Sequence, residues 1–223
     1  MARRKNQKRR KEILSNTFSL IRANGLDKVS LQKIAESSNI SKSLLQSYYS
    51  HKSVLINELV DTMFSALGDC IEEVAQDENQ FAKTETFIYL ILTLGTIDPG
   101  IDQLIREAFR ESKALNSWSN MLFNWLHEQN LFEKQKYSIE IRGGVPFVAS
   151  GAARLYAEKE KLQLNPLDIS EYAIKTLMFS FFNEKKKVVN ATIEEARTLI
   201  EKLDAERVLE YLEQTFYCEP IDD

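Results

Sequence analysis

Residues 30–52, SLQKIAESSNISKSLLQSYYSHK, constrain the fold of this chain more than any other stretch. Ser30 and Ser41 each stand before a short segment with apolar residues at helical spacing. A serine hydroxyl at such a position accepts hydrogen bonds from the free N–H groups of the first helical turn. Asn39 lies between the segments and tolerates the left-handed backbone of a tight turn. The pattern predicts two short helices joined by a turn, the helix-turn-helix unit.

The outward face of the second short helix is polar and mostly uncharged, with Lys42, Ser43, Gln46 and Ser47 opposite Leu45. A face that is only solvated more often carries Glu–Lys pairs. Base edges in the major groove of DNA are read by donors and acceptors such as Gln for adenine and Lys for guanine. The face therefore favours DNA binding, although a helical hairpin inside a larger bundle would show the same apolar spacing.

Positive charge is concentrated at the N-terminal end of the chain. Residues 1–52 contain 12 Lys and Arg against 3 Asp and Glu, a net charge of +9, so the remaining residues carry −13 because the whole chain carries −4. This asymmetry is typical of a phosphate-binding end on an acidic body. A basic tail that aids solubility is the alternative, but positive charge continues past residues 2–11, at Arg22, Lys28, Lys33, Lys42 and Lys52.

Residues 2–11, ARRKNQKRRK, form a basic arm. We expect either a disordered tail or an arm that follows phosphates, or enters a minor groove, and orders on binding. A helix is predicted over residues 9–24, and Gly25 is expected to end it. Its buried stripe is predicted to contain Ile13, Leu14, Phe18 and Ile21. Together with the two short helices it would form a three-helix domain.

The composition indicates an all-α protein, because only 7 Gly and 4 Pro occur in 223 residues and long stretches have a helical apolar period. No segment is apolar for long enough to span a membrane, and the N-terminus lacks the apolar core of a signal peptide. Cys70 and Cys218 form no metal or redox motif, and no metal or cofactor is expected. A reducing cytoplasm fits these features.

A set of residues between 9 and 58 carries a resemblance to a known family. These residues are Ile13, Phe18, Gly25, Val29, Ser30, Ile34, Ala35, Ile40, Ser41, Lys42, Tyr48, Tyr49, Lys52 and Leu55. In this order and spacing they resemble the DNA-binding domain of the tetracycline-repressor (TetR) family of bacterial regulators. The resemblance implies an all-α fold with an N-terminal three-helix helix-turn-helix DNA-binding domain, residues 1–52, and a C-terminal helical ligand-binding and dimerisation domain, residues 53–223. It also implies a bacterial, nucleoid-associated protein with double-stranded DNA as its partner.

The second short helix departs from the family pattern. The family often has Gly at the position of Ser43, Ser or Thr at that of Leu44, and Tyr at that of Gln46. We expect Leu44 to pack on a thymine methyl and Gln46 to pair with adenine, which changes the base preference. The resemblance assigns Tyr48 and Lys52 to phosphate contacts, which position the helix without reading sequence. The full set of expected DNA-binding residues is Arg9, Ser30, Ser41, Lys42, Ser43, Leu44, Gln46, Ser47, Tyr48 and Lys52.

The second domain is predicted to be a series of helices rich in aromatic residues. The predicted ranges are 53–76, 83–94 ended by Gly95, 100–111 and 114–129. Each aromatic residue taken singly is best explained as core. As a group they occupy the region where the family forms its effector pocket, which suits a small apolar or amphipathic ligand. The expected ligand-binding residues are Phe64, Phe87, Tyr89, Phe109, Trp118, Met121, Trp125 and Phe147, with Asn124 and His127 as further polar candidates.

Two helices are predicted over 138–161, kinked or restarted at 143–146, and over 166–183. In the family, two such helices from each subunit form a four-helix dimer interface, so the resemblance implies a homodimer. Internal core helices of a monomer are the alternative. Two short amphipathic helices within 192–216 would either cover the ligand domain or widen the dimer interface.

These features favour a sequence-specific DNA-binding regulator of transcription that acts as a homodimeric, ligand-responsive repressor on a palindromic operator. A ligand-independent architectural or cell-cycle factor of the same fold is an alternative. A protein-interaction module is another. An all-α enzyme is disfavoured, because we find no phosphate-binding glycine loop and no nucleophile–base pair, and the only histidines are His51 and His127.

Overall fold

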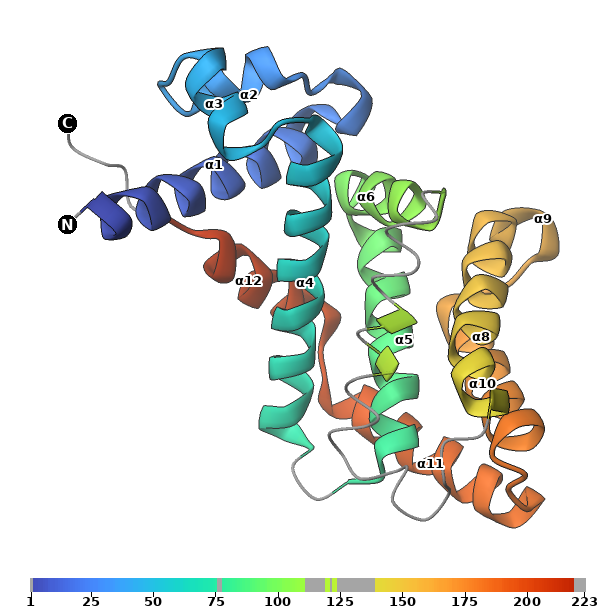
Figure 1. Cartoon of the computed structure of the whole chain (residues 1–223). Helices are drawn as coiled ribbons and strands as arrows, with labels where there is room; N and C mark the ends of the chain where they lie inside the picture. The colour runs from blue at the N-terminus through green and yellow to red at the C-terminus, as the bar shows by residue number, and fades with distance from the viewer. Residues whose placement is uncertain (1, 76–77, 111–118, 121, 124–138, 219–223) are drawn as a thin grey trace.

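The fold was analysed in a computed structural model, which describes residues 2–75, 78–110, 119–120, 122–123 and 139–218. Within these residues the regular elements are all helical, which confirms the predicted all-α class. Figure 1 shows short helices gathered at one end of the molecule and longer helices extending away from them. The helix that joins the two parts begins at Lys52, next to the predicted domain boundary. The boundary itself stays a prediction.

The N-terminal part has the predicted three-helix arrangement. Its elements are α1 (Ala2–Asn24), the short 3-10 turn η1 (Leu26–Lys28), α2 (Leu31–Ser37) and α3 (Lys42–Tyr48). Gly25 follows α1 with φ of 83°, and Asn39 lies in the α2–α3 turn with φ of 50°, so both left-handed residues stand at the predicted ends. The four apolar residues predicted for the buried stripe of α1 are all buried.

Helix α1 begins at Ala2, so the prediction of a start near residue 9 is wrong. Residues 2–11 contain Ala, Arg, Lys and Gln, which are strong helix formers, and neither Gly nor Pro. The helix therefore continues through the basic arm, which was expected to be a disordered tail or an arm that orders on binding DNA.

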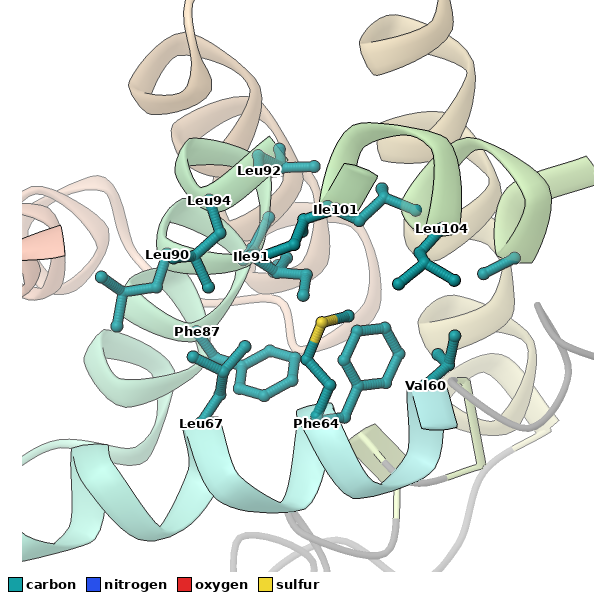
Figure 2. Packing of buried hydrophobic residues seen from close by; sticks show 14 of the residues in the cluster. Val60, Phe64, Leu67, Phe87, Leu90, Ile91, Leu92, Leu94, Ile101 and Leu104 are labelled. Atoms are coloured by element: carbon teal, nitrogen blue, oxygen red, sulfur yellow. The ribbon is translucent and has the colours of Figure 1, made fainter. Parts of the chain in front are cut away.

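Helix α4 (Lys52–Val74) leads into the second part of the molecule, close to the predicted range. Val74 was predicted on its apolar face but is the last helical residue and is 42% exposed. Figure 2 shows the core that α4 forms with the helices α5 (Gln80–Ile97) and α6 (Pro99–Arg110), where Phe64 lies beside Phe87. The two rings contact edge to face, with centroids 5.7 Å apart.

Helix α5 is the central helix of the second part and contacts α4, α6 and three of the later helices, α10, α11 and α12. The remaining elements are α8 (Ile139–Ala157), α9 (Lys159–Leu162), α10 (Pro166–Thr176), the π-helical turn η2 (Leu177–Phe181), α11 (Lys186–Lys202) and α12 (Ala205–Phe216). Figure 1 shows α8 and α10 at one edge of the molecule and α12 returning toward α1.

Gly95 does not end its helix, contrary to the prediction, because α5 continues to Ile97. A Cβ at this position would collide with the hydroxyl of Tyr156 and lie 2.9 Å from Cδ1 of Ile105. Gly95 is therefore a point of close approach between α5 and its neighbours α6 and α8, not a helix terminator.

Helix α8 is not restarted at residues 143–146, and it ends at Ala157 rather than at 161. Pro146 lies inside it and removes one backbone hydrogen bond. Val145, Val148 and Ala149 on either side of Pro146 are buried, and their packing holds the helix across that point. The predicted helix 166–183 is α10 continued by η2.

The C-terminal pair of helices was predicted within 192–216 but starts earlier, because α11 begins at Lys186. Helix α11 packs on α5, whereas α12 packs on α4, α5 and α1. The pair therefore covers the second domain, and α12 also reaches the N-terminal part.

Glu85 is a fully buried carboxyl group on α5. Both of its carboxyl oxygens lack a hydrogen-bond partner among the described residues. Burial, and then the nearby Glu171, raise its pKa, while Lys175 and Arg197 lower it, and together they place the pKa at about 8. Those two cations are already bound by Glu171, at 2.6 and 2.5 Å. At neutral pH, Glu85 therefore keeps its proton in the folded protein.

Replacing Glu85 with Gln should flatten the pH dependence of stability. Between the ordinary pKa of 4.5 and about 8, the unfolded chain has lost a proton that the folded protein still holds. Wild-type stability should thus fall as pH rises through this window, by at most about 1.4 kcal/mol per pH unit relative to Glu85→Gln. Urea unfolding at pH 5, 6.5 and 8 measures the difference. Glu201→Gln, at an exposed site on α11, is the control, and a difference that does not change with pH would contradict the assignment.

Candidate nucleic-acid interface

Helix α3 presents one continuous exposed face. Ser43, Gln46 and Ser47 are exposed on it together with Lys42, and Leu44 beside them is 44% exposed. The predicted contact residues of α3 are therefore brought together on one surface. Lys42 and Gln46 supply donors and acceptors, and Leu44 supplies an apolar surface, which is the combination that reads base edges in a major groove.

The two predicted serine caps are both present. The hydroxyl of Ser30 accepts from the backbone N–H of Lys33 at 3.2 Å, at the start of α2. The hydroxyl of Ser41 accepts from the N–H of Leu44 at 3.1 Å, at the start of α3. Each cap satisfies one free N–H of a seven-residue helix.

The inner side of α3 is fixed by Leu45 and Tyr49, which are both fully buried. Burial raises the pKa of the Tyr49 phenol, so it stays neutral. The Arg10 guanidinium lies 5.4 Å from the centre of its ring and binds both carboxylate oxygens of Glu58, with 2.7 Å from Nε to Oε1. Because Arg10 is on α1 and Glu58 on α4, this pair braces the helices that carry α3. The prediction that Tyr49 is a core residue is confirmed.

The remaining predicted contact residues lie apart from the exposed face of α3. Arg9 is on α1 and pairs with Glu12 at 2.9 Å, and Tyr48 is half-buried at the end of α3. Lys52 turns inward, where its ammonium donates to the backbone oxygen of Leu26 at 2.7 Å. Burial lowers its pKa. The predicted contact residues of α3 therefore share one exposed face, whereas Lys52 points away from it toward Leu26.

The end of α1 contacts the start of α6, a junction that the sequence analysis missed. Nε of Arg22 donates to Oδ2 of Asp98 at 2.6 Å, and the other Asp98 oxygen accepts from the N–H groups of Gly100 and Ile101 at 2.9 and 3.0 Å. A Cβ at position 100 would lie only 2.5 Å from Cα of Arg22, so this close contact of α6 with α1 requires the glycine. The Asp98–Pro99 pair indicated a helix start, but no signal in the sequence identified Arg22 as its partner.

A second contact of the same junction uses Gln103. Its amide oxygen accepts from the backbone N–H of Leu26 at 2.6 Å, beside Gly25. Leu26 therefore binds Gln103 through its N–H and Lys52 through its C=O. A small cavity next to it is lined by residues of η1, α4 and α6, including Asp27, Asn57 and Glu107.

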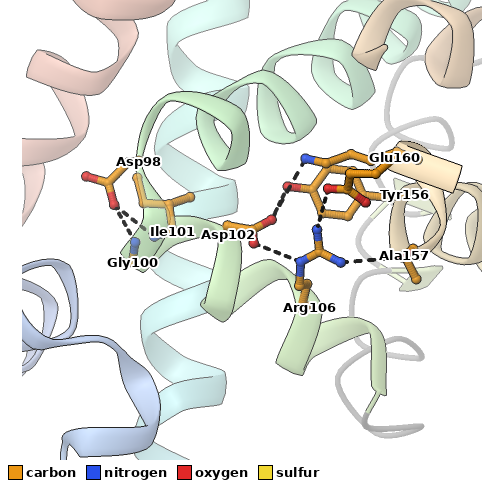
Figure 3. Close-up of polar contacts among 9 residues, drawn as sticks. Asp98, Gly100, Ile101, Asp102, Arg106, Tyr156, Ala157 and Glu160 are labelled. Carbon is orange, nitrogen blue, oxygen red and sulfur yellow. Dashed lines mark hydrogen bonds and ion pairs between the residues drawn. The ribbon is translucent and has the colours of Figure 1, made fainter. Parts of the chain in front are cut away.

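Helix α6 is held to α8 by a polar cluster around Asp102 (Figure 3). Oδ1 of Asp102 accepts from the hydroxyl of Tyr156 at 2.6 Å, and Oδ2 accepts from Nε of Arg106 at 2.7 Å. The Lys159 ammonium and the Arg106 guanidinium lie 4.1 and 5.3 Å from the centre of the Tyr156 ring. Burial, and then the bond to Asp102, raise the pKa of Tyr156, which stays a hydrogen-bond donor. The first turn of α6 is thus bound both to the N-terminal part and to α8.

The structure brings only some of the predicted ligand-binding residues together. Phe64 and Phe87 are buried neighbours, while Phe109 lies against Tyr156 with ring centroids 6.0 Å apart. Tyr89 is half-buried on α5, and Phe147 is 65% exposed on α8. The other predicted members lie outside the described residues: Trp118, Met121, Asn124, Trp125 and His127.

A small apolar cavity lies between α5 and α8. Thr84 and Ile88 line it from α5, and Val145 and Val148 line it from α8. Leu122, which lies between these helices in the sequence, also lines it. Among the helices that the structure describes, none combines the length and apolar character that crossing a membrane requires.

Comparison with known proteins places the first domain in a family. Residues 13–59 match the model of the bacterial regulatory proteins of the tetR family. The fold is similar to that of RolR in a crystal structure of its complex with the ligand resorcinol, with a TM-score of 0.60 and 12% identity over 88% of this chain and 96% of that chain. At this identity the similarity shows the fold alone. No curated protein sequence matches the chain significantly.

The family match covers α2 and α3, the elements whose exposed side chains form the candidate interface. The rest of the chain has the helical arrangement that it shares with RolR. Residues 13–59 therefore form a DNA-binding domain like that of the tetR family of bacterial regulatory proteins, and the chain is a DNA-binding regulator of transcription.

Proposed function

We propose that the protein is a ligand-responsive repressor that acts as a homodimer on a palindromic operator in the bacterial cytoplasm, at the nucleoid. One observation carries this proposal: the first turn of α6 and the residue before it are bonded both to the DNA-binding domain and to α8. Asp98 and Gln103 make the first set of bonds and Asp102 makes the second. A rearrangement around α8 would therefore displace the DNA-binding domain.

The outer side of α8 and α10 supports a homodimer. Phe147, Tyr172 and Phe179 are 65%, 52% and 43% exposed on α8, α10 and η2. Contiguous exposed apolar surface marks an interaction site. Helices α8 and α10 contact each other and lie at the edge of the molecule (Figure 1). A two-fold dimer through this face would present two copies of α3 to successive major grooves, roughly 34–36 Å apart.

A small apolar or amphipathic effector is supported by the aromatic and aliphatic character of the second domain. RolR, which has a similar fold, was solved with resorcinol bound. An effector that binds one spacing of the DNA-binding domains better than the other would shift the population toward that spacing. The change in operator affinity cannot exceed this difference in effector affinity.

Selection of genomic fragments with the purified protein at physiological salt tests the proposal. We expect one palindromic motif to be enriched, and we expect an effector from the pathway encoded near that motif to weaken binding. Enrichment of many unrelated sites that no small molecule releases would favour an architectural or cell-cycle factor instead. No binding to any DNA would overturn the proposal.

Replacing Gln46 with Ala should weaken operator binding and relax the base preference at one position of each half-site. The loss of a bidentate base contact corresponds to about 1–3 kcal/mol. Lys42→Ala should weaken binding and reduce its salt dependence. Fluorescence anisotropy with the selected operator measures both effects. Lys186→Ala, which removes the same charge at the start of α11, should leave the affinity unchanged, and equal losses for Lys42 and Lys186 would count against the assigned interface.

Introducing charge on the outer face of α8 and η2 should produce monomers. The Phe147→Glu and Phe179→Glu variants place a carboxylate where apolar surface would be buried, which should weaken association more than tenfold per subunit. Sedimentation equilibrium measures the dimer dissociation constant. Tyr217→Glu changes an aromatic residue of equal exposure beyond the end of α12 and serves as the control. A dimer that persists in the double variant would show that another face associates.

A further inference from the structure

Helix α12 ends against the DNA-binding domain. The ring of Phe216, its last residue, stacks on the ring of Phe18 in α1, with centroids 4.2 Å apart and planes inclined by 23°. Both rings are buried, at 3% and 2% exposure. Phe18 belongs to the core stripe of α1, so α12 completes the core of a domain that lies far from it in the sequence.

The same contact has a polar part centred on Arg22. Its Nη1 donates to the Glu213 carboxylate of α12 at 2.5 Å, while its Nε binds Asp98 before α6. Its guanidinium also lies 5.4 Å from the centre of the Phe18 ring. One side chain of α1 therefore binds both α6 and α12.

The other side of α12 is anchored to the second domain. Val208 and Leu212 are buried, and the helix packs on α4 and α5. Tyr211 lies next to Asp69 and Glu73 of α4. The apolar stripe of α12 thus contacts both the second domain and α1. It joins the two domains without a covalent link, whereas α4 joins them through the chain itself.

We propose that α12, together with the α6 junction, is a non-covalent connection that fixes the orientation of the DNA-binding domain, and that this orientation sets the specificity for operator DNA. The inference rests on the proposed function, because it concerns a dimer that must place two copies of α3 at a fixed spacing. A domain held only through α4 and the α6 junction would sample more orientations, and ordering it on an operator would cost free energy. A domain held by α12 as well is already ordered. Nonspecific binding of one DNA-binding domain to phosphates does not require two copies of α3 at a fixed spacing. It should therefore depend less on α12 than operator binding does.

The test compares Glu213→Gln, Phe216→Leu and the double variant with wild type. Glu210→Gln is the matched control, since Glu210 is exposed on the same helix and makes no hydrogen bond or ion pair with α1 among the described residues. Affinity for the selected operator and for a scrambled duplex of equal length is measured by anisotropy. Hydrogen exchange of α1 and α6 amides is measured on the free proteins. Thermal unfolding verifies that each variant is folded.

We expect the double variant to lose about threefold to tenfold in operator affinity, little in affinity for the scrambled duplex, and protection of amides at the end of α1. A variant whose DNA-binding domain simply unfolds would lose affinity for the operator and for the scrambled duplex together. In that case Glu213→Gln, which keeps the stacked rings, is the variant that tests the connection. An unchanged ratio of the two affinities with unchanged exchange in α1 would overturn the inference. If the wild-type protein binds no operator, the proposed function fails. The connection through α12 can still be tested in that case, because unaltered hydrogen exchange of the α1 amides in the variants would refute it.

Discussion

The carboxylate of Asp98 joins the two domains because each of its oxygens binds a different part of the chain. One oxygen accepts from the N–H groups at the start of α6, and the other accepts from Arg22 at the end of α1. A helix start carries partial positive charge, and so does the guanidinium, so a single anion stabilises both. The close packing at Gly100, the Gln103 bond to Leu26 and the α12 contact with Arg22 all depend on this alignment of α1 with α6.

The features that could be predicted from the sequence are those whose cause lies within a few residues. Ser30 and Ser41 cap helices that start at the next residue, and Asn39 and Gly25 adopt left-handed backbone at helix ends. The features that were missed depend on partners far away in the chain. Gly95 reads as a helix end by itself, and only the approach of Tyr156 explains why it lies inside α5.

The candidate sites differ in the same way. The expected contact residues of α3 lie within one short helix, so helical spacing was enough to place them on the face opposite Leu45. The expected effector residues are spread over several helices, and spacing could not tell a buried pair such as Phe64 and Phe87 from the exposed Phe147. Lys52 was assigned by resemblance, but its preference for the Leu26 carbonyl follows from the position of η1, which the sequence does not reveal.

The close approach of α5 and α8 also bears on how this chain can vary in evolution. The Tyr156 hydroxyl occupies the space where a residue larger than glycine at position 95 would place its Cβ. The same hydroxyl donates to Asp102, so a substitution at 95 would displace a hydrogen bond as well as a ring. Relatives that carry Ala at the position of Gly95 should therefore carry Phe or a smaller residue at the position of Tyr156, together with a changed residue at that of Asp102. These three positions, on α5, α8 and α6, should change as a group.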